Sequence, residues 1–342
     1  NFQFDTDQQG VQIEKYFLHL QNQLRSFAGS LVFVMENSLS QSYSGPIFRG
    51  DRFDDHAGTP PDQVYSPAYR ERISLEYPVY GVDRKLPQAQ VENTIRRIYP
   101  LRRIALNLLL QSDPDTVFSS QNRDGLIRRL IDHGVPARRL FALLSEGVWV
   151  CYPGMADDGG RGDFLSWTWY REAVKSRKLF WGGPYIDRLG NYLLPCAVPL
   201  TGSDGHTLGA AGLDISFEYI SRVLMKNEIA GKTAIRKYLV DQHGRIVMFS
   251  ELGNRIMTGA SPKMASPRSF PYFHLLRQMI NDHDRQMETV IDGIPVIISY
   301  APIQLLNWYF VQIVDSAKLA EMPHDALVQQ VHGRNNNMPR PK

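Results

Sequence analysis

One order of short elements occurs twice in this chain, and it limits the folds that the chain can adopt. The first copy consists of two strands, a helix and three strands, predicted at 140–144, 148–152, 169–178, 184–187, 192–200 and 208–215. The second copy has the same order in weaker form, at 237–241, 246–249, 271–281, 286–291, 294–301 and 308–314. The turns between neighbouring strands are too short for the crossovers that parallel strands need. We therefore expect two modules of about 90–100 residues, each built on an antiparallel sheet.

A long helix is predicted before the repeat. Between residues 8 and 39, apolar residues recur at a three–four spacing, at Val11, Ile13, Phe17, Leu20, Leu24, Phe27, Leu31, Val34 and Met35. Because this helix is longer than the usual globular one, we expect it to form a spine along more than one domain. Residues 40–95 show no lasting helical or alternating pattern. Further helices are predicted at 87–111, where Pro100 splits or kinks the helix, and at 124–133.

Composition excludes several classes of protein. The chain has 342 residues, enough for two domains that each bury a core. Its net charge is only +3, and nucleic-acid-binding proteins usually carry a strong basic stripe, so no nucleic-acid partner is expected. No apolar run reaches the roughly 18–20 residues that a helix needs to cross a bilayer. The chain begins Asn-Phe-Gln without Met, so we expect an excised fragment.

No motif for catalysis or for metal binding is present. Two cysteines, Cys151 and Cys196, are too few for a disulfide framework or a structural zinc site. The nine histidines show no His-x-x-x-His or His-x-Glu spacing, and there is no Gly-x-Ser-x-Gly elbow. We therefore expect a domain that is not an enzyme and that binds neither a metal nor a cofactor.

Four motifs, taken in order, resemble a known family. They are Gly147-Val-Trp-Val-Cys-Tyr-Pro-Gly154, Trp169-Tyr-Arg-Glu-Ala173, Gly183-Pro-Tyr-Ile-Asp187 and Gly212-Leu-Asp-Ile-Ser216. Their order and spacing are similar to those of the double Cache sensor domain, an extracytoplasmic domain of bacterial transmembrane receptors. The resemblance covers about residues 140–316, and the helix at 8–39 by position.

The resemblance implies an α+β fold, in which a long N-terminal helix precedes two PAS-like modules with antiparallel five-stranded sheets. The implied division is a spine helix at 1–45, a membrane-distal module with an irregular insertion at 46–230, a membrane-proximal module at 231–317, and a polar tail at 318–342. The implied location is periplasmic or extracellular, with transmembrane helices and a signalling output domain outside this fragment. That output domain would be a kinase, a cyclase or a chemoreceptor signalling region. A homodimer is left open.

The resemblance also implies a ligand pocket in the distal module. In amino-acid-binding members, a Tyr and an Arg clamp the ligand carboxylate, and a Trp-Tyr pair, a Tyr-x-Asp element and a final Asp complete the site. The matching residues here are Trp169, Tyr170, Tyr185, Asp187 and Asp214. The clamp differs, because its Arg falls on Trp167 and its Tyr on Gly162, and an indole cannot replace a bidentate guanidinium.

Carboxylates together with aromatic faces suit an organic cation, so the sequence predicts a small amine or quaternary ammonium ligand at Trp167, Trp169, Tyr170, Tyr185, Asp187 and Asp214. A purely structural role for these residues stays open. In that role the Trp-Tyr pair packs the core, Asp187 caps a turn before Gly190, and Asp214 caps a helix that begins near Phe217.

Two further alternatives stay open as well. The fold could be a protein-interaction scaffold without a small-molecule ligand, in which residues 40–95 make the contact, or a soluble enzyme whose site has no recognised motif. In a PAS-like sheet ordered 2-1-5-4-3, Cys151 and Cys196 would lie roughly 14 Å apart. Since a disulfide needs Cα atoms within about 7 Å, we expect two buried free thiols.

Overall fold

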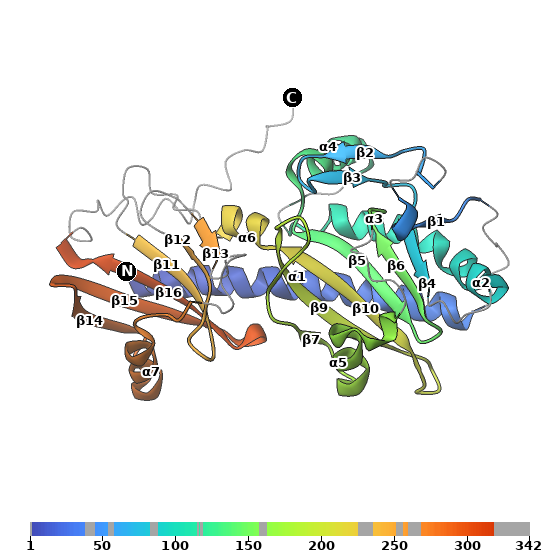
Figure 1. Ribbon diagram of the computed structural model, residues 1–342. Helices are drawn as coiled ribbons and strands as arrows, with labels where there is room; N and C mark the ends of the chain where they lie inside the picture. The colour runs from blue at the N-terminus through green and yellow to red at the C-terminus, as the bar shows by residue number, and fades with distance from the viewer. Residues whose placement is uncertain are drawn as a thin grey trace, which may run out of the picture. The chain divides into compact units, whose positions relative to one another are not determined.

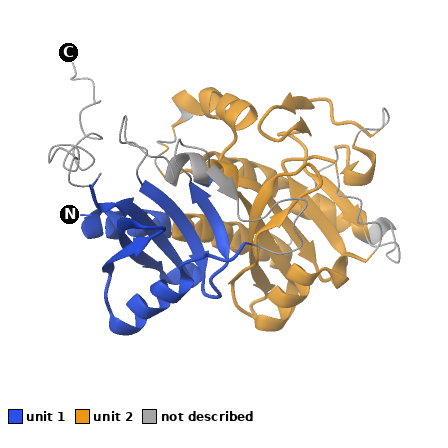
Figure 2. Ribbon diagram, turned by 60° about the vertical axis from the view of Figure 1, so that its left-hand side comes forward, with its two compact units in different colours: residues 1–15, 220–342 blue, residues 16–219 orange. Residues whose placement is uncertain are grey.

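The computed structural model describes residues 2–37, 45–53, 58–82, 88–114, 116, 119–156, 163–224, 235–250, 256–258 and 268–317. The chain forms two compact units, shown in Figure 2. Unit 1 comprises residues 1–15 and 220–342, and unit 2 comprises residues 16–219. The predicted domain limits at 45/46 and 230/231 stay predictions. Residues 230 and 231 and the predicted polar tail at 318–342 lie outside the described residues.

The predicted N-terminal helix is present as α1, which runs from Phe2 to Glu36 and so begins earlier than its clearest apolar pattern. Its first residues belong to unit 1 and the rest, from Tyr16, to unit 2. The three–four spacing places one apolar face against the protein. The buried residues of this face include Ile13, Phe17, Leu20, Leu24, Phe27, Leu31 and Val34, each at most 6% exposed.

Unit 2 is built on a sheet whose central strands have the predicted PAS-like order (Figure 1). These strands are β5 (Ala137–Leu144), β6 (Val148–Tyr152), β7 (Phe180–Trp181), β8 (Tyr185–Ile186), β9 (Tyr192–Thr201) and β10 (Thr207–Ser216). The order β6-β5-β10-β9 continues to the short strands β7 and β8, which both pair with β9. All these pairs are antiparallel, as the short turns predict.

The sheet of unit 2 is wider than the predicted five strands, because the segment expected to be irregular contributes to it. Strand β4 (Val79–Val82) pairs antiparallel with β6, and β1 (Phe48–Arg49) pairs parallel with β4, which gives eight strands. A separate hairpin consists of β2 (Val64–Ser66) and β3 (Glu71–Ile73). The prediction of a wholly irregular segment at 40–95 is therefore wrong. Strands of two to four residues are too short to show an alternating pattern in the sequence.

The helices of unit 2 follow the predicted pattern. Helix α2 (Gln88–Ile98) and helix α3 (Arg102–Leu110) are separated by one 3₁₀ turn, η2 (Tyr99–Leu101), which contains Pro100. The predicted split at this proline is thus confirmed. The remaining helices are α4 (Arg123–His133), α5 (Thr168–Ser176) and α6 (Phe217–Leu224), and the division between the units falls inside α6.

Unit 1 repeats the same topology. Its strands are β11 (Ile235–Asp241), β12 (Ile246–Ser250), β13 (Ile256–Thr258), β14 (Gln286–Ile291), β15 (Ile294–Ile303) and β16 (Trp308–Asp315). They form one antiparallel sheet in the order β13-β12-β11-β16-β15-β14, so β13 is added to the five predicted strands. Helix α7 (Phe273–Asp282) packs its buried Leu276 and Met279 into an apolar core with Tyr238 and Val240.

The opposite face of this sheet carries the start of α1. Successive residues of a strand point to opposite faces, so Lys237 lies opposite the apolar core that contains Tyr238. Lys237 Nζ donates a hydrogen bond to Gln9 Oε1 at 3.0 Å, and Thr6 Oγ1 donates to Gln312 Oε1 at 2.9 Å. Helix and sheet meet here through these polar groups and through an apolar cluster of Phe2 with Ile235, Ile297 and Val314. The α+β class with two PAS-like antiparallel modules is confirmed.

Candidate ligand-binding site

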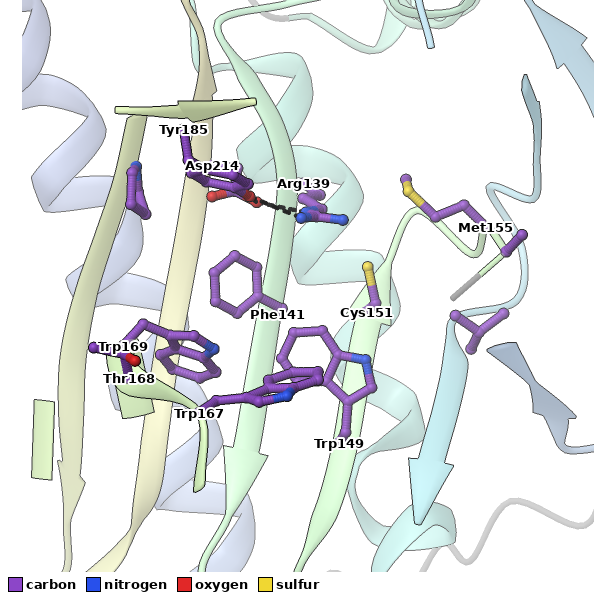
Figure 3. A pocket seen from close by; sticks show the side chains of 13 residues that line it. Arg139, Phe141, Trp149, Cys151, Met155, Trp167, Thr168, Trp169, Tyr185 and Asp214 are labelled. Atoms are coloured by element: carbon purple, nitrogen blue, oxygen red, sulfur yellow. Dashed lines mark hydrogen bonds and ion pairs between the residues drawn. The ribbon is translucent and has the colours of Figure 1, made fainter. Parts of the chain in front are cut away.

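A cavity of about 480 Å³ opens in unit 2 beside its sheet (Figure 3). Strands β4, β5, β6, β8, β9 and β10 contribute to its wall, together with residues 155–156 and 167–169. The residues that line it are Val79, Arg139, Phe141, Trp149, Cys151, Met155, Ala156, Trp167, Thr168, Trp169, Tyr185, Pro195 and Asp214. A volume of this size lies in the range of small-molecule sites.

The alternation of strand residues brings the wall together. Arg139 and Phe141 lie two positions apart on β5, and Trp149 and Cys151 lie two positions apart on β6, so each pair faces the cavity. In the register between β10 and β5, Asp214 is directly opposite Arg139 and Gly212 is opposite Phe141. A Cβ atom at Gly212 would lie 2.1 Å from the Phe141 ring. This glycine therefore allows the Phe141 ring to lie across β10.

Four aromatic side chains form one side of the cavity (Figure 3). The ring centroids of Trp149 and Trp167 are 5.0 Å apart, and those of Phe141 and Trp169 are also 5.0 Å apart, both in edge-to-face geometry. Phe141 and Trp149 are 5.2 Å apart in a tilted arrangement. Such contacts hold the rings in place, each contributing about 0.5–1.5 kcal/mol beyond area burial. The aromatic wall is thus largely formed before any ligand binds.

A polar cluster of Arg139, Asp214 and Tyr185 lies on another side of the cavity. Arg139 Nε donates to Asp214 Oδ2 at 2.5 Å, and the Tyr185 hydroxyl donates to the same oxygen at 2.7 Å. Arg139 Nη2 donates to the Tyr185 oxygen at 2.9 Å. Burial, with the charge of Asp214 beside it, raises the pKa of Tyr185 well above its usual range, so this hydroxyl stays protonated and serves as a donor.

The second oxygen of Asp214 differs from the first. The Asp214 side chain is only 1% exposed, yet no described residue gives its Oδ1 a hydrogen bond. A buried carboxylate oxygen without a donor costs free energy, of the order of 1–3 kcal/mol or more for a charged group. Because Asp214 lines the cavity, a ligand in the cavity could supply the missing donor.

The structure brings four of the six predicted site residues together. Trp167, Trp169, Tyr185 and Asp214 all line the cavity. Tyr170 is 8% exposed, does not line the cavity, and packs edge-to-face on Trp169 at 6.0 Å. Gly162, on which the Tyr of the carboxylate clamp falls, lies outside the described residues.

Asp187 is also absent from the cavity wall. Its carboxylate accepts hydrogen bonds from the backbone N–H groups of Leu189 and Asn191, at 2.9 and 2.8 Å, and from Asn191 Nδ2 at 2.8 Å. These are the bonds of an aspartate that holds a turn, as in the structural alternative. Asp214 does not have its alternative role as a helix cap, because its carboxylate pairs with Arg139 and Tyr185.

Several residues of the cavity wall were not predicted from the sequence, and Arg139, Phe141 and Trp149 are among them. The strand predicted at 140–144 leaves Arg139 outside it, whereas β5 begins at Ala137. Alternation from Ala137 would have put Arg139 and Phe141 on one face. Trp149 lies in the first of the four motifs, and this position could have indicated that its ring lies beside the pocket.

Both cysteines are buried and free, as expected. Cys151 lines the cavity, whereas Cys196 does not. Burial raises the pKa of the Cys196 thiol, so it stays protonated. Within the described residues, no three side chains of His, Cys, Asp or Glu gather as metal ligands would. None of the helices among these residues combines the length and the apolar character that a membrane span requires.

Comparisons with known proteins agree with this architecture. Residues 152–222 match the family model described as the first PDC sensor domain of methyl-accepting chemotaxis protein-like proteins. No curated protein matches the chain significantly.

Solved structures with a similar fold are ligand-binding domains of bacterial chemoreceptors. Pseudomonas aeruginosa PctC, in complex with GABA, is 19% identical, with 64% of this chain and 90% of that chain covered and a TM-score of 0.39. Pseudomonas fluorescens CtaA, in complex with L-leucine, is 20% identical, with 65% and 86% covered and a TM-score of 0.38. Campylobacter jejuni Tlp3, in complex with L-norvaline, is 16% identical, with 70% and 80% covered and a TM-score of 0.40.

The matched family segment begins at Tyr152, the last residue of β6, and ends in α6, so it contains β7, β8, β9 and β10, four of the eight strands of the cavity-bearing sheet. At these identities the structural matches assign no ligand to this chain. The resemblance to the double Cache sensor domain is confirmed, and residues 152–222 are similar to the first PDC sensor domain of methyl-accepting chemotaxis protein-like proteins.

Proposed function

We propose that this chain is the ligand-sensing part of a transmembrane signalling receptor, and that its ligand occupies the cavity of unit 2. The sensor-family match and the cavity support this proposal. The proposed location is periplasmic or extracellular, with transmembrane helices and a signalling output domain outside this sequence. Signalling by a homodimer is compatible with this proposal.

We further propose that the ligand is a small organic amine, and the buried Asp214 oxygen that lacks a donor is the observation that carries this proposal. An N–H group would give Asp214 Oδ1 the hydrogen bond that no described residue gives it. The aromatic faces of Trp149, Trp167 and Trp169 suit the body of such a ligand. A quaternary ammonium compound has no N–H to donate, so the ligand class is narrower than the class predicted from the sequence.

Signalling follows from a change in the population of conformations. A ligand that binds one conformation of unit 2 better than another shifts the equilibrium toward the conformation that it prefers. The free energy of this shift cannot exceed the difference between its binding free energies for the two conformations. Helix α1 contributes residues to both units, so it is the element that we propose to carry the change toward the membrane.

The test is a thermal-shift screen of amines, carboxylates, purines and amino acids, followed by calorimetry on the ligands that stabilise the protein. A ligand at 100 times its dissociation constant should stabilise the folded state by about 2.7 kcal/mol. Asp214→Asn should weaken binding of an amine at least tenfold, which is about 1.4 kcal/mol, because a charge-assisted hydrogen bond becomes a neutral one.

The chain offers a matched control for this variant. Asp113 also lies in an Arg–Asp–Tyr cluster, where its Oδ2 accepts from Arg129 Nη2 at 2.7 Å and from Tyr219 OH at 2.6 Å. Asp113 does not line the cavity. Asp113→Asn should therefore lower stability but leave amine affinity unchanged. Equal loss of affinity in both variants, or none in Asp214→Asn, would contradict the proposed site.

A further inference from the structure

The charges on the described residues of the cavity wall sum to zero. Among the described residues that line the cavity, Arg139 and Asp214 are the two with charged side chains. They form an ion pair at 2.5 Å, in which the side chains are 15% and 1% exposed. The formal charge of this lining is therefore +1 − 1 = 0. Asp214 offers an oxygen that lacks a donor, but it does not offer an uncompensated negative charge.

This balance decides which kind of N–H donor fits. An alkylammonium ligand would bring a second positive charge close to Arg139, beside an ion pair whose side chains are largely buried. A charged group that moves from water into the cavity loses its hydration. If it finds no counter-charge there, no interaction with the protein replaces the hydration that it has lost. An uncharged N–H donor would satisfy Asp214 Oδ1 without that loss. Arg139 thus acts as a built-in cation that competes with a charged ligand.

The opposite side of the cavity favours a flat ligand body. The ring centroids are 5.0–6.0 Å apart in four pairs among the side chains of Phe141, Trp149, Trp167 and Trp169. Planar π-systems gain offset-stacked or edge-to-face contacts at such rings, whereas an alkyl chain gains only area burial. An amino group on an aromatic ring is uncharged at neutral pH and still carries N–H donors.

We infer that Arg139 is a specificity-determining residue, and that the site takes an uncharged arylamine or an amino-substituted nitrogen heterocycle rather than an alkylammonium ion. This inference rests on the proposed function, because it refines the ligand class of the same cavity. Arg139 lies on β5 opposite Asp214, so the selectivity is fixed by the strand register rather than by a loop.

The first test uses the unaltered protein and three probes. Aniline and adenine are uncharged aromatic amines at neutral pH, and benzylamine is an alkylammonium of similar size to aniline. Calorimetry or ligand-observed NMR should show that aniline and adenine each bind roughly tenfold or more tightly than benzylamine, equal to about 1.4 kcal/mol. Benzylamine binding as tightly as aniline, or more tightly, would overturn the inference.

The second test removes the built-in cation. In Arg139→Met the lining carries the unbalanced charge of Asp214, so the preference should reverse and benzylamine should bind more tightly than aniline. Arg139→Lys keeps the charge and should keep the preference for aniline. Arg129→Met removes the arginine of the matched cluster, away from the cavity, and should leave all three affinities unchanged.

The outcomes separate this inference from the proposed function. Amine binding that depends on Asp214, with benzylamine preferred by the unaltered protein, would overturn the role of Arg139 and leave the sensor site intact. No binding of any of the three probes, or binding that Asp214→Asn does not change, would overturn both. If Arg139→Met does not fold, the comparison of the three probes on the unaltered protein still decides the inference.

Discussion

Asp214 and Asp187 show how much the environment of one residue type decides its role. Both are aspartates expected in one pocket, and both accept several hydrogen bonds. Asp187 receives donors from the turn that it holds, whereas Asp214 lies inside a strand, where its neighbours donate to one oxygen only. The same group holds a turn in one place, and in the other it pairs with Arg139 and keeps one buried oxygen without a donor.

Gly212 gives a prediction at the scale of a single residue. An added Cβ would lie 2.1 Å from the Phe141 ring, so Gly212→Ala should push this ring into the cavity. We expect a loss of about 1–3 kcal/mol in the free energy of unfolding, as for other overpacked sites, together with weaker ligand binding. Denaturant unfolding and calorimetry measure the two effects.

Gly183→Ala is the control for this variant, because an added Cβ there meets no atom within 4 Å. It should change stability little and leave binding unchanged. Equal stability and affinity in the two variants would show that the position of the Phe141 ring does not depend on Gly212.

Helix α1 allows a sharper prediction at the scale of an element, because it carries two glycines in different surroundings. A Cβ at Gly10 would lie 2.4 Å from the Cβ of Ala301 on β15, whereas a Cβ at Gly29 would meet no atom within 4 Å. Alanine favours a helix over glycine by about 1 kcal/mol. Gly29→Ala should therefore stabilise the protein by up to about 1 kcal/mol, and Gly10→Ala should destabilise it despite the same gain in helix propensity.

Thermal or denaturant unfolding of the two glycine variants measures this difference. Stabilisation by both substitutions would mean that α1 does not approach β15 as closely as described. Destabilisation by both would mean that the exposed side of α1 near Gly29 is covered by another part of the protein.

The elements differ in how well the sequence predicts them. Long strands with tight turns, such as β9 and β10, carry enough alternation and turn residues to be predicted, and so does the break at Pro100. Strand β4 was missed because its four residues follow Pro78 and include Gly81, so they show no alternating pattern. Its pairing with β6 is a long-range contact. Arg139 was missed because the start of β5 was placed three residues late, and the start of a strand is set by its neighbours as much as by its own residues.

At the scale of the whole molecule, two modules share one topology, but the cavity lined by Asp214 lies in unit 2. The helix α1 meets the sheet of unit 1 through polar pairs such as Lys237 with Gln9, and it packs into unit 2 through buried Phe17, Leu20 and Leu24. The first stretch also packs Phe2 against Ile235, Ile297 and Val314 of unit 1, so α1 makes apolar contacts in both units.

Hydrogen exchange tests whether the ligand binds in unit 2 rather than in unit 1. An amine ligand should slow amide exchange most in β5, β6 and β10 of unit 2, because these strands form the cavity wall, and opening of that wall becomes rarer when the ligand is bound. The strands β11 and β16 should be protected less. Protection that is largest in unit 1 would place the ligand elsewhere.

A crystal structure with an amine ligand identified in the screen tests the central claim most directly. It should show a ligand nitrogen within hydrogen-bonding distance of Asp214 Oδ1, roughly 2.7–3.2 Å. The ligand body should lie against Trp149, Trp167 and Trp169. A ligand bound outside this cavity, or Asp214 Oδ1 bonded to another group of the protein while the ligand is present, would contradict it.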